Sequence, residues 1–158
     1  MVSIKLTLLE GARAPERNEG DAGWDCFING FCTFDKDGRH DLKVKEYNLC
    51  EGHIIGAPLG FKSEIPKDYY AQVVPRSGLA AKYGLTITNS PGTIDSTYRG
   101  EWVALLTCCD KHSSPIHLKV GDKICQFMLR REIKTEITIV GFLEESERGE
   151  NGFGSTGE

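Results

Sequence analysis

The chain has 158 residues, a formal net charge of −4 and 39% hydrophobic residues, which indicate one soluble domain with its own core. Its scattered Lys and Arg residues argue against nucleic-acid binding, which requires a one-sided basic patch. No apolar run is long enough to span a membrane, and the first apolar stretch is interrupted by Glu10 and too short for a secretory signal, so we expect a cytoplasmic protein.

Short runs rich in β-branched and aromatic residues alternate with turn signals, a pattern typical of an all-β sandwich or barrel. One short helix is predicted over Ser77–Tyr83. The sequence DKDG at 35–38 predicts a turn between strands, because it lacks the flanking helices and the distal glutamate of a calcium loop. The predicted strands cover residues 4–9, 44–49, 54–62, 69–74, 85–88, 102–109, 124–130 and 137–142.

The cysteines and histidines do not have the spacing of a metal site. Six cysteines without a CxxC pair, in a chain of this length, indicate reduced core thiols rather than a disulfide framework. The four histidines have no cysteines or carboxylates at zinc-binding spacing, so we expect structural or surface roles for them.

The first motif with chemical content is PRSGLAAKYGLT at 75–86. It places Arg76, Ser77 and Gly78 at the start of the predicted helix, where free N–H groups and the guanidinium could hold an anion. A serine-capped surface helix with a solvated arginine would use the same residues.

The second motif is NSPGTIDSTYRGEW at 89–102. Ser90, Pro91 and Gly92 predict a tight turn between strands, so Asp95 and Tyr98 are expected just past a hairpin that could admit a planar ligand. A lone aspartate at such a position is also a common turn residue.

The third motif is the C-terminal sequence RGENGFGSTGE at 148–158. Its glycines allow backbone N–H groups to turn toward an anion, Arg148 can fork onto phosphate oxygens and Phe153 offers a face for a base. The absence of a P-loop lysine excludes a Walker motif. A solvated tail would have the same composition.

Together with AGWD at 22–25 and GDKICQ at 121–126, these sequences resemble, in order, the five motifs of the trimeric dUTPase family. The resemblance spans residues 22–157. It departs from the family at Trp24 and Cys26 in the first motif and at Asn151 in the fifth.

The resemblance implies a jelly-roll-like β-barrel or sandwich over 1–147, followed by a flexible lid arm over 148–158. It implies a homotrimer that hydrolyses dUTP to dUMP and pyrophosphate by water attack at the α-phosphate, with Asp95 as general base and Tyr98 under the deoxyribose. Mg²⁺ would be chelated by the triphosphate without direct protein ligands, and Asp25 would either reach one of its waters or organise the strand ends. The implied binding residues are Arg76, Ser77, Gly78 and Gln126 for phosphates, Asn89, Gly92, Thr93 and Ile94 for uracil, and Arg148, Phe153, Gly154, Ser155 and Thr156 in the arm.

Two alternatives share this fold. A dCTP deaminase would need a glutamate base near the hairpin, where this chain has IDSTYRG. A dUTPase-like protein that serves chiefly as a nucleotide-gated binding partner would keep the same motifs, and the presence of Asp95 favours catalysis over that reading.

Overall fold

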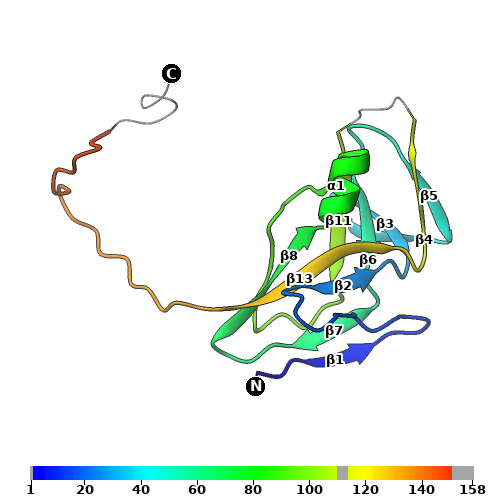
Figure 1. The fold of residues 1–158 in the computed structure, drawn as a ribbon, viewed down its shortest axis with the longest axis horizontal. Coiled ribbons are helices and arrows are strands. Elements are labelled where there is room, and N and C mark those ends of the chain that lie inside the picture. The colour runs from blue at the N-terminus through cyan, green and yellow to red at the C-terminus, as the bar shows by residue number, and fades with distance from the viewer. Residues whose placement is uncertain (1, 110–113, 151–158) are drawn as a thin grey trace.

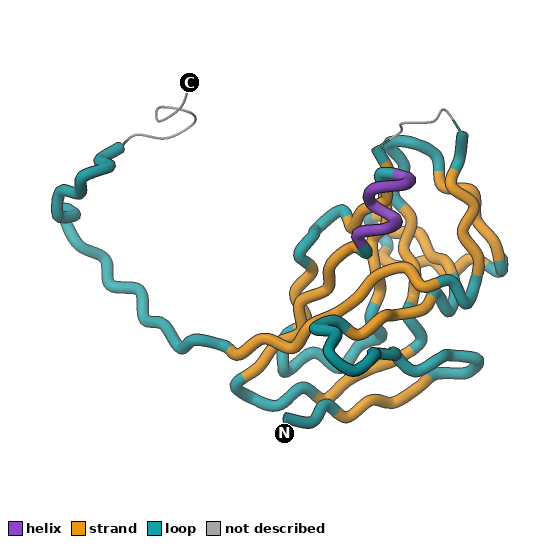
Figure 2. The backbone as a smooth tube through the Cα atoms, in the orientation of Figure 1, coloured by secondary structure: helices purple, strands orange, loops and turns teal. Residues whose placement is uncertain are grey.

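A computed structural model describes residues 2–109 and 114–150 of the chain (Figure 1). Strands account for nearly all of the regular structure in these residues, and Figure 2 shows the single short helix lying against them. The predicted all-β fold with one short helix is therefore confirmed. In chain order the elements are β1 (Lys5–Leu8), β2 (Trp24–Phe27), β3 (Phe31–Asp35), β4 (Gly38–Leu42), β5 (Glu46–Leu49), β6 (Ile55–Pro58), β7 (Phe61–Glu64), β8 (Tyr69–Pro75), α1 (Ser77–Tyr83), β9 (Leu85–Ile87), β10 (Gly92–Ile94), β11 (Val103–Cys108), β12 (Ile116–Lys119) and β13 (Lys123–Arg131).

The strands form antiparallel sheets around one core. A four-stranded sheet has the order β10-β8-β13-β2, a five-stranded sheet has the order β4-β3-β6-β11-β9, and β1 pairs with β7 and β12 with β5. Trp102 lies in the core at 1% exposure, with ring centroids 4.9 Å from Phe61 and 5.1 Å from Phe127. Its indole N–H donates to Oγ of the buried Ser63 at 3.1 Å, which satisfies the polar end of a large buried ring.

Several predicted elements are found with small shifts. The helix over Ser77–Tyr83 is confirmed, and the turn at 35–38 joins β3 to β4. The predicted strand over 54–62 divides into β6 and β7 at Gly60, whose φ of +73° reverses the chain and strains other residues. Five strands were not predicted: β2, β3, β4, β10 and β12, which are short and carry charged or polar residues.

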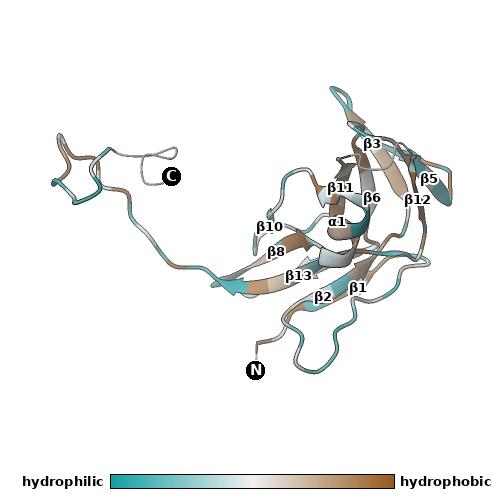
Figure 3. Cartoon of the chain, turned by 45° about the horizontal axis from the view of Figure 1, so that its top comes forward, coloured by the Kyte–Doolittle hydropathy of each residue, from teal (hydrophilic) through white to brown (hydrophobic). Residues whose placement is uncertain are grey.

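The predicted strand over 137–142 is wrong for the isolated chain. After β13 ends at Arg131 the chain runs away from the sheets without a strand partner (Figure 1). Ile137 and Ile139 are 90% and 94% exposed, and Figure 3 shows hydrophobic residues along this extended segment as well as in the sheets. Its apolar composition is that of a strand, but a strand requires a neighbouring edge and none of the described strands lies beside it.

All six cysteines are free thiols, and four of them are buried, as expected for core cysteines. Cys26 and Cys125 face each other across β2 and β13, and hydrogen bonding to Cys125 together with burial raises the pKa of Cys26. Within the described residues, no helix has the length and apolar character that crossing a bilayer requires.

Candidate active site

A pocket of about 530 Å³ lies between the start of α1 and the strands β2 and β13. It brings together five predicted residues from three distant segments: Asp25 on β2, Arg76, Ser77 and Gly78 at the start of α1, and Gln126 on β13. A larger cavity of about 850 Å³ shares Arg76 with this pocket but contains no other predicted site residue. The smaller pocket is therefore the candidate site.

Arg76 is held at the edge of this pocket by two contacts. Its Nε lies 3.1 Å from Oδ1 of Asp25, and its Nη1 donates to the backbone carbonyl of Lys123 at 3.2 Å. These contacts leave the Nη2 end of the guanidinium for a ligand. Ser77 and Gly78 follow at once, and the N–H groups at the start of a helix have no intrahelical acceptor. This geometry suits a ligand with several anionic oxygens.

Gln126 lies directly opposite Asp25 in the pairing of β13 with β2. Its side-chain amide donates to the carbonyl of Pro75 at 3.3 Å, which ties β13 to the segment that leads into α1. A Cβ atom placed on Gly23 would collide with Oε1 of Gln126. The position of Gln126 therefore depends on a glycine in the loop before β2.

Asp95 lies in an exposed turn directly after β10. The N–H of Tyr98 donates to the carbonyl of Asp95 at 3.1 Å, and Arg99 donates to the carbonyls of Ser96 at 2.7 Å and Tyr98 at 3.0 Å. The hydroxyl of Tyr98 donates to the carbonyl of Glu101 at 3.1 Å. The turn that carries Asp95 is thus fixed by its own backbone and by Arg99.

The predicted hairpin around Pro91 is wrong in its pairing. β9 pairs with β11, and β10 pairs with β8, so the two flanking strands do not pair with each other. Residues 89–94 instead connect the five-stranded sheet to the four-stranded sheet, and the Ser90–Pro91 peptide bond is cis. Asn89 and Thr93 are exposed there, Ile94 is half-buried and Gly92 is buried.

The structure does not bring Asp95 to the pocket. β10 pairs with β8 in the register Gly92 to Val73 and Ile94 to Ala71, so Asp95 falls opposite Tyr70. Arg76 follows the other end of β8, and at ~3.3 Å per residue the separation along the strand is about 20 Å. Within one chain, the Arg76 pocket and the Asp95 turn are two separate half-sites.

One of the predicted arm residues lies within the described part of the chain and four lie outside it. Arg148 lies in a turn of the extended segment, where the N–H of Gly149 donates to the carbonyl of Ser146 at 3.0 Å. This segment leads away from the sheets (Figure 1). Phe153, Gly154, Ser155 and Thr156 lie outside the described residues.

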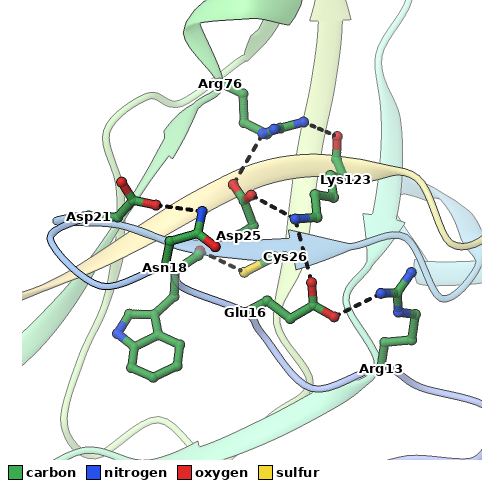
Figure 4. A network of polar contacts seen from close by, with 9 residues as sticks. Arg13, Glu16, Asn18, Asp21, Asp25, Cys26, Arg76 and Lys123 are labelled. Carbon is green, nitrogen blue, oxygen red and sulfur yellow. Dashed lines mark hydrogen bonds and ion pairs between the residues drawn. The ribbon is translucent and has the colours of Figure 1, made fainter.

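A network of charged side chains, not predicted from the sequence, lies beside the pocket (Figure 4). Nζ of Lys123 lies 3.2 Å from Oδ2 of Asp25 and 3.5 Å from Oε2 of Glu16, whose other oxygen is 2.8 Å from Arg13. The hydrogen bond from Arg13 holds the pKa of Glu16 below its usual range. Lys123 stands inside the GDKICQ motif, which was the available signal, but nothing in the motif shows that its side chain reaches Asp25.

Metal-binding groups are sparse in this part of the molecule. Among residues 2–109 and 114–150, no three His, Cys, Asp or Glu side chains gather in a way that could hold a metal ion. Two carboxylates, Asp21 and Asp25, line the pocket; Asp21 accepts a hydrogen bond from Asn18 at 3.0 Å. Mg²⁺ commonly keeps several waters and binds through one or two carboxylates and substrate phosphates, so the residues fit an ion carried by a polyphosphate.

Comparison with known proteins identifies the family. The dUTPase family model matches residues 33–157. The deoxyuridine 5'-triphosphate nucleotidohydrolase of Fusobacterium nucleatum is 37% identical over 99% of this chain and 97% of its own length, and that of Clostridium novyi is 40% identical over 90% and 88%. The solved dUTPase of Staphylococcus bacteriophage 80alpha with dUPNHPP is 26% identical, covers 99% of both chains and has a TM-score of 0.76. The chain belongs to the dUTPase family.

Proposed function

We propose that this protein hydrolyses dUTP to dUMP and pyrophosphate, with Asp95 as the general base, in a site completed by other copies of the chain. The observation that carries the proposal is the pocket in which Arg76 offers Nη2 beside Ser77, Gly78 and Gln126. A polyphosphate matches these donors, and relatives at 37% and 40% identity are deoxyuridine 5'-triphosphate nucleotidohydrolases.

The reaction requires one proton acceptor and strong charge neutralisation. A water oxygen attacks the α-phosphorus, the bond from that phosphorus to the oxygen bridging to the β-phosphorus breaks, and pyrophosphate leaves with the bonding electrons. Asp95 accepts the proton of the attacking water, a general-base contribution of about 10²–10⁴-fold. The fixed turn around Asp95 supports this role, because a base must be held in one place.

Base and sugar are selected at the second half-site. The backbone of 89–94 reads the uracil edge, and the close approach of that turn leaves no space for the methyl group of thymine. Tyr98 packs under the deoxyribose and leaves no space for a 2′-hydroxyl. The residue is 44% exposed and its hydroxyl donates to the carbonyl of Glu101, so it offers a fixed, accessible surface. Specificity is thus steric as well as polar.

A homotrimer would join the separated half-sites. Arg76 and Asp95 lie about 20 Å apart along β8, so the pocket of one copy needs the Asp95 turn of another. The extended segment carries exposed apolar residues that are costly to leave in water, including Ile133, Ile137, Ile139, Phe142 and Leu143 at 82–94% exposure. If this segment packed against a neighbouring copy, these apolar side chains would be buried. Arg148 and residues 151–158 would then belong to the site of a third copy.

Magnesium enters as part of the substrate complex. The triphosphate chelates Mg²⁺, which neutralises charge on the phosphate oxygens when bound. In the pocket, Arg76 and the N–H groups of Ser77 and Gly78 hold the remaining oxygens. Residues of the arm, Arg148, Phe153, Gly154, Ser155 and Thr156, close over the nucleotide and exclude water.

The test of this function is a comparison of four nucleotides. The protein is incubated with Mg²⁺ and dUTP, dCTP, dTTP or UTP, and pyrophosphate and ammonia are measured. We expect pyrophosphate from dUTP at a rate at least about 10²-fold above the others, because the site rejects both a methyl group and a 2′-hydroxyl. Ammonia from dCTP would contradict the proposal and establish the deaminase alternative.

Gly23→Ala is expected to weaken dUTP binding about tenfold. The new Cβ meets Oε1 of Gln126 and forces that side chain out of the pocket, which removes about one hydrogen bond to phosphate. The measurement is KM for dUTP together with the melting temperature. The matched control is Gly30→Ala, where a Cβ meets nothing within 4 Å and φ is not positive. Equal KM values for the two variants would contradict the role of Gln126.

A further inference from the structure

Arg76 lies at one end of a row of side chains with alternating positive and negative charge on the protein surface (Figure 4). Asp25 stands between two cations, with Oδ1 at 3.1 Å from Nε of Arg76 and Oδ2 at 3.2 Å from Nζ of Lys123. Each oxygen of the carboxylate therefore has its own cation, which fixes the plane of the carboxylate. The fixed carboxylate in turn sets the orientation of the Arg76 guanidinium through Nε.

An irregularity in β13 brings Lys123 to this face of the sheet. Gln126 pairs with Asp25 and Cys125 with Cys26, so regular alternation would pair Ile124 with Phe27. Instead Lys123 pairs with Phe27, and Ile124 is the extra residue of a β-bulge. Residues two apart on a strand share a face, so Phe27 and its partner Lys123 lie on the face of Asp25.

The bulge thus exchanges the faces of two side chains. In regular register Lys123 would point into the core, whereas here Ile124 is buried at 2% exposure and Lys123 is partly exposed beside the pocket. A bulge commonly re-aims a side chain next to a functional site. The same shift also directs the backbone carbonyl of Lys123 toward Nη1 of Arg76.

We propose that Lys123 and Asp25 are positioning residues that fix the guanidinium of Arg76 in the phosphate pocket. Lys123 holds Asp25 through its ammonium group and Arg76 through its carbonyl, and Asp25 holds Nε of Arg76. The carboxylate of Asp25 thereby serves the arginine directly. This inference rests on the proposed function, because it takes the nucleotide phosphates as the ligand of Arg76.

The contact distances favour an indirect role for Lys123. Its ammonium lies within 3.5 Å of both Asp25 and Glu16 and 5.6 Å above the ring of Phe27. Two carboxylates already take its charge, whereas Arg76 keeps Nη2 for a ligand. Because the side chains of Asp25 and Lys123 are 25% and 38% exposed, solvent weakens the attraction between them, and we assign their effect to geometry.

The test is a double-mutant cycle between Lys123→Met and Arg76→Ala, read out as the Kd for the non-hydrolysable analogue dUpNHpp with Mg²⁺. In the wild-type background we expect Lys123→Met to weaken binding about tenfold, as losses of supporting contacts commonly do. In the Arg76→Ala background the same change is expected to alter Kd less than about twofold, because nothing remains to be positioned. A tenfold loss in both backgrounds would show that Lys123 acts directly on phosphate and would overturn the proposal.

Two further variants keep the test decisive if Lys123→Met loses stability. Lys123→Arg keeps a cation at the position and is expected to retain most of the affinity, and Asp25→Asn should repeat the pattern of Lys123→Met in the cycle. The Mg²⁺ concentration that gives half-maximal binding is measured for Asp25→Asn and wild type. A raised Mg²⁺ requirement for Asp25→Asn without coupling to Arg76→Ala would show that Asp25 serves the metal alone and would also overturn the proposal.

The matched control for charge is Lys62→Met, which removes one exposed lysine from β7, remote from the pocket, and should leave Kd unchanged. Melting temperatures separate loss of fold from loss of positioning. Wild-type protein that does not bind dUpNHpp would contradict the proposed function itself and the positioning role with it. Wild-type binding with an additive cycle would contradict the positioning role alone.

Discussion

Asp95→Asn is expected to lower kcat for dUTP by about 10² or more and to leave the Kd for dUpNHpp nearly unchanged. The amide has the size and shape of the carboxylate but cannot accept a proton from water at neutral pH. Asp95 is exposed, and it is the backbone carbonyl of Asp95 that accepts the hydrogen bond from Tyr98, so the substitution should leave the turn in place. Single-turnover kinetics and titration with the analogue measure the two quantities separately.

The control for this prediction is Asp37→Asn, a second exposed aspartate, in the turn between β3 and β4. It should leave kcat and Kd at their wild-type values. If Asp95→Asn instead weakened analogue binding while kcat at saturation stayed unchanged, Asp95 would be a binding group. The general base would then have to be sought elsewhere in the assembled site.

The sequence predicted most of the strands and the residues that gather in the pocket at the start of α1, because both depend on local signals. Short apolar runs located eight strands, seven of which exist, and PRSGLA located the start of the helix with Arg76 at its edge. Gln126 joined the pocket as expected because the KICQ part of the motif lies on the long strand β13. These features need only the alternation of side chains and the position of one helix end.

The remaining features depend on pairing between distant strands, which local patterns do not specify. The bulge at Ile124 turns Lys123 toward Asp25, and a one-residue shift of this kind is invisible to periodicity. The pairing of β9 with β11 and of β10 with β8 replaced the expected hairpin for the same reason. The apolar run over 137–142 predicted a strand, but none of the described strands lies beside it to pair with it.

The separation of the half-sites leads to a complementation experiment. In the first mixture, Arg76→Ala and Asp95→Asn chains are unfolded together and refolded at equal amounts. A site is active only if its pocket comes from an Asp95→Asn chain and its turn from an Arg76→Ala chain. Random assembly in a closed cyclic trimer then gives about ½ × ½, roughly a quarter of the wild-type sites. Each variant refolded alone should stay at its own background, so the expected rise in turnover is large.

A second mixture tests the arm in the same way. Deletion of residues 148–158 should remove most turnover with little change in melting temperature, because the segment after β13 leaves the sheets (Figure 1). Co-refolded with Asp95→Asn, the deletion should also restore roughly a quarter of the sites, since turn and arm then come from different copies. Light scattering confirms that trimers form. If the first mixture shows only background activity, Arg76 and Asp95 act in a site formed by one chain, which would contradict the separation of about 20 Å along β8. If the second mixture shows only background activity, the Asp95 turn and the arm of each site come from the same copy.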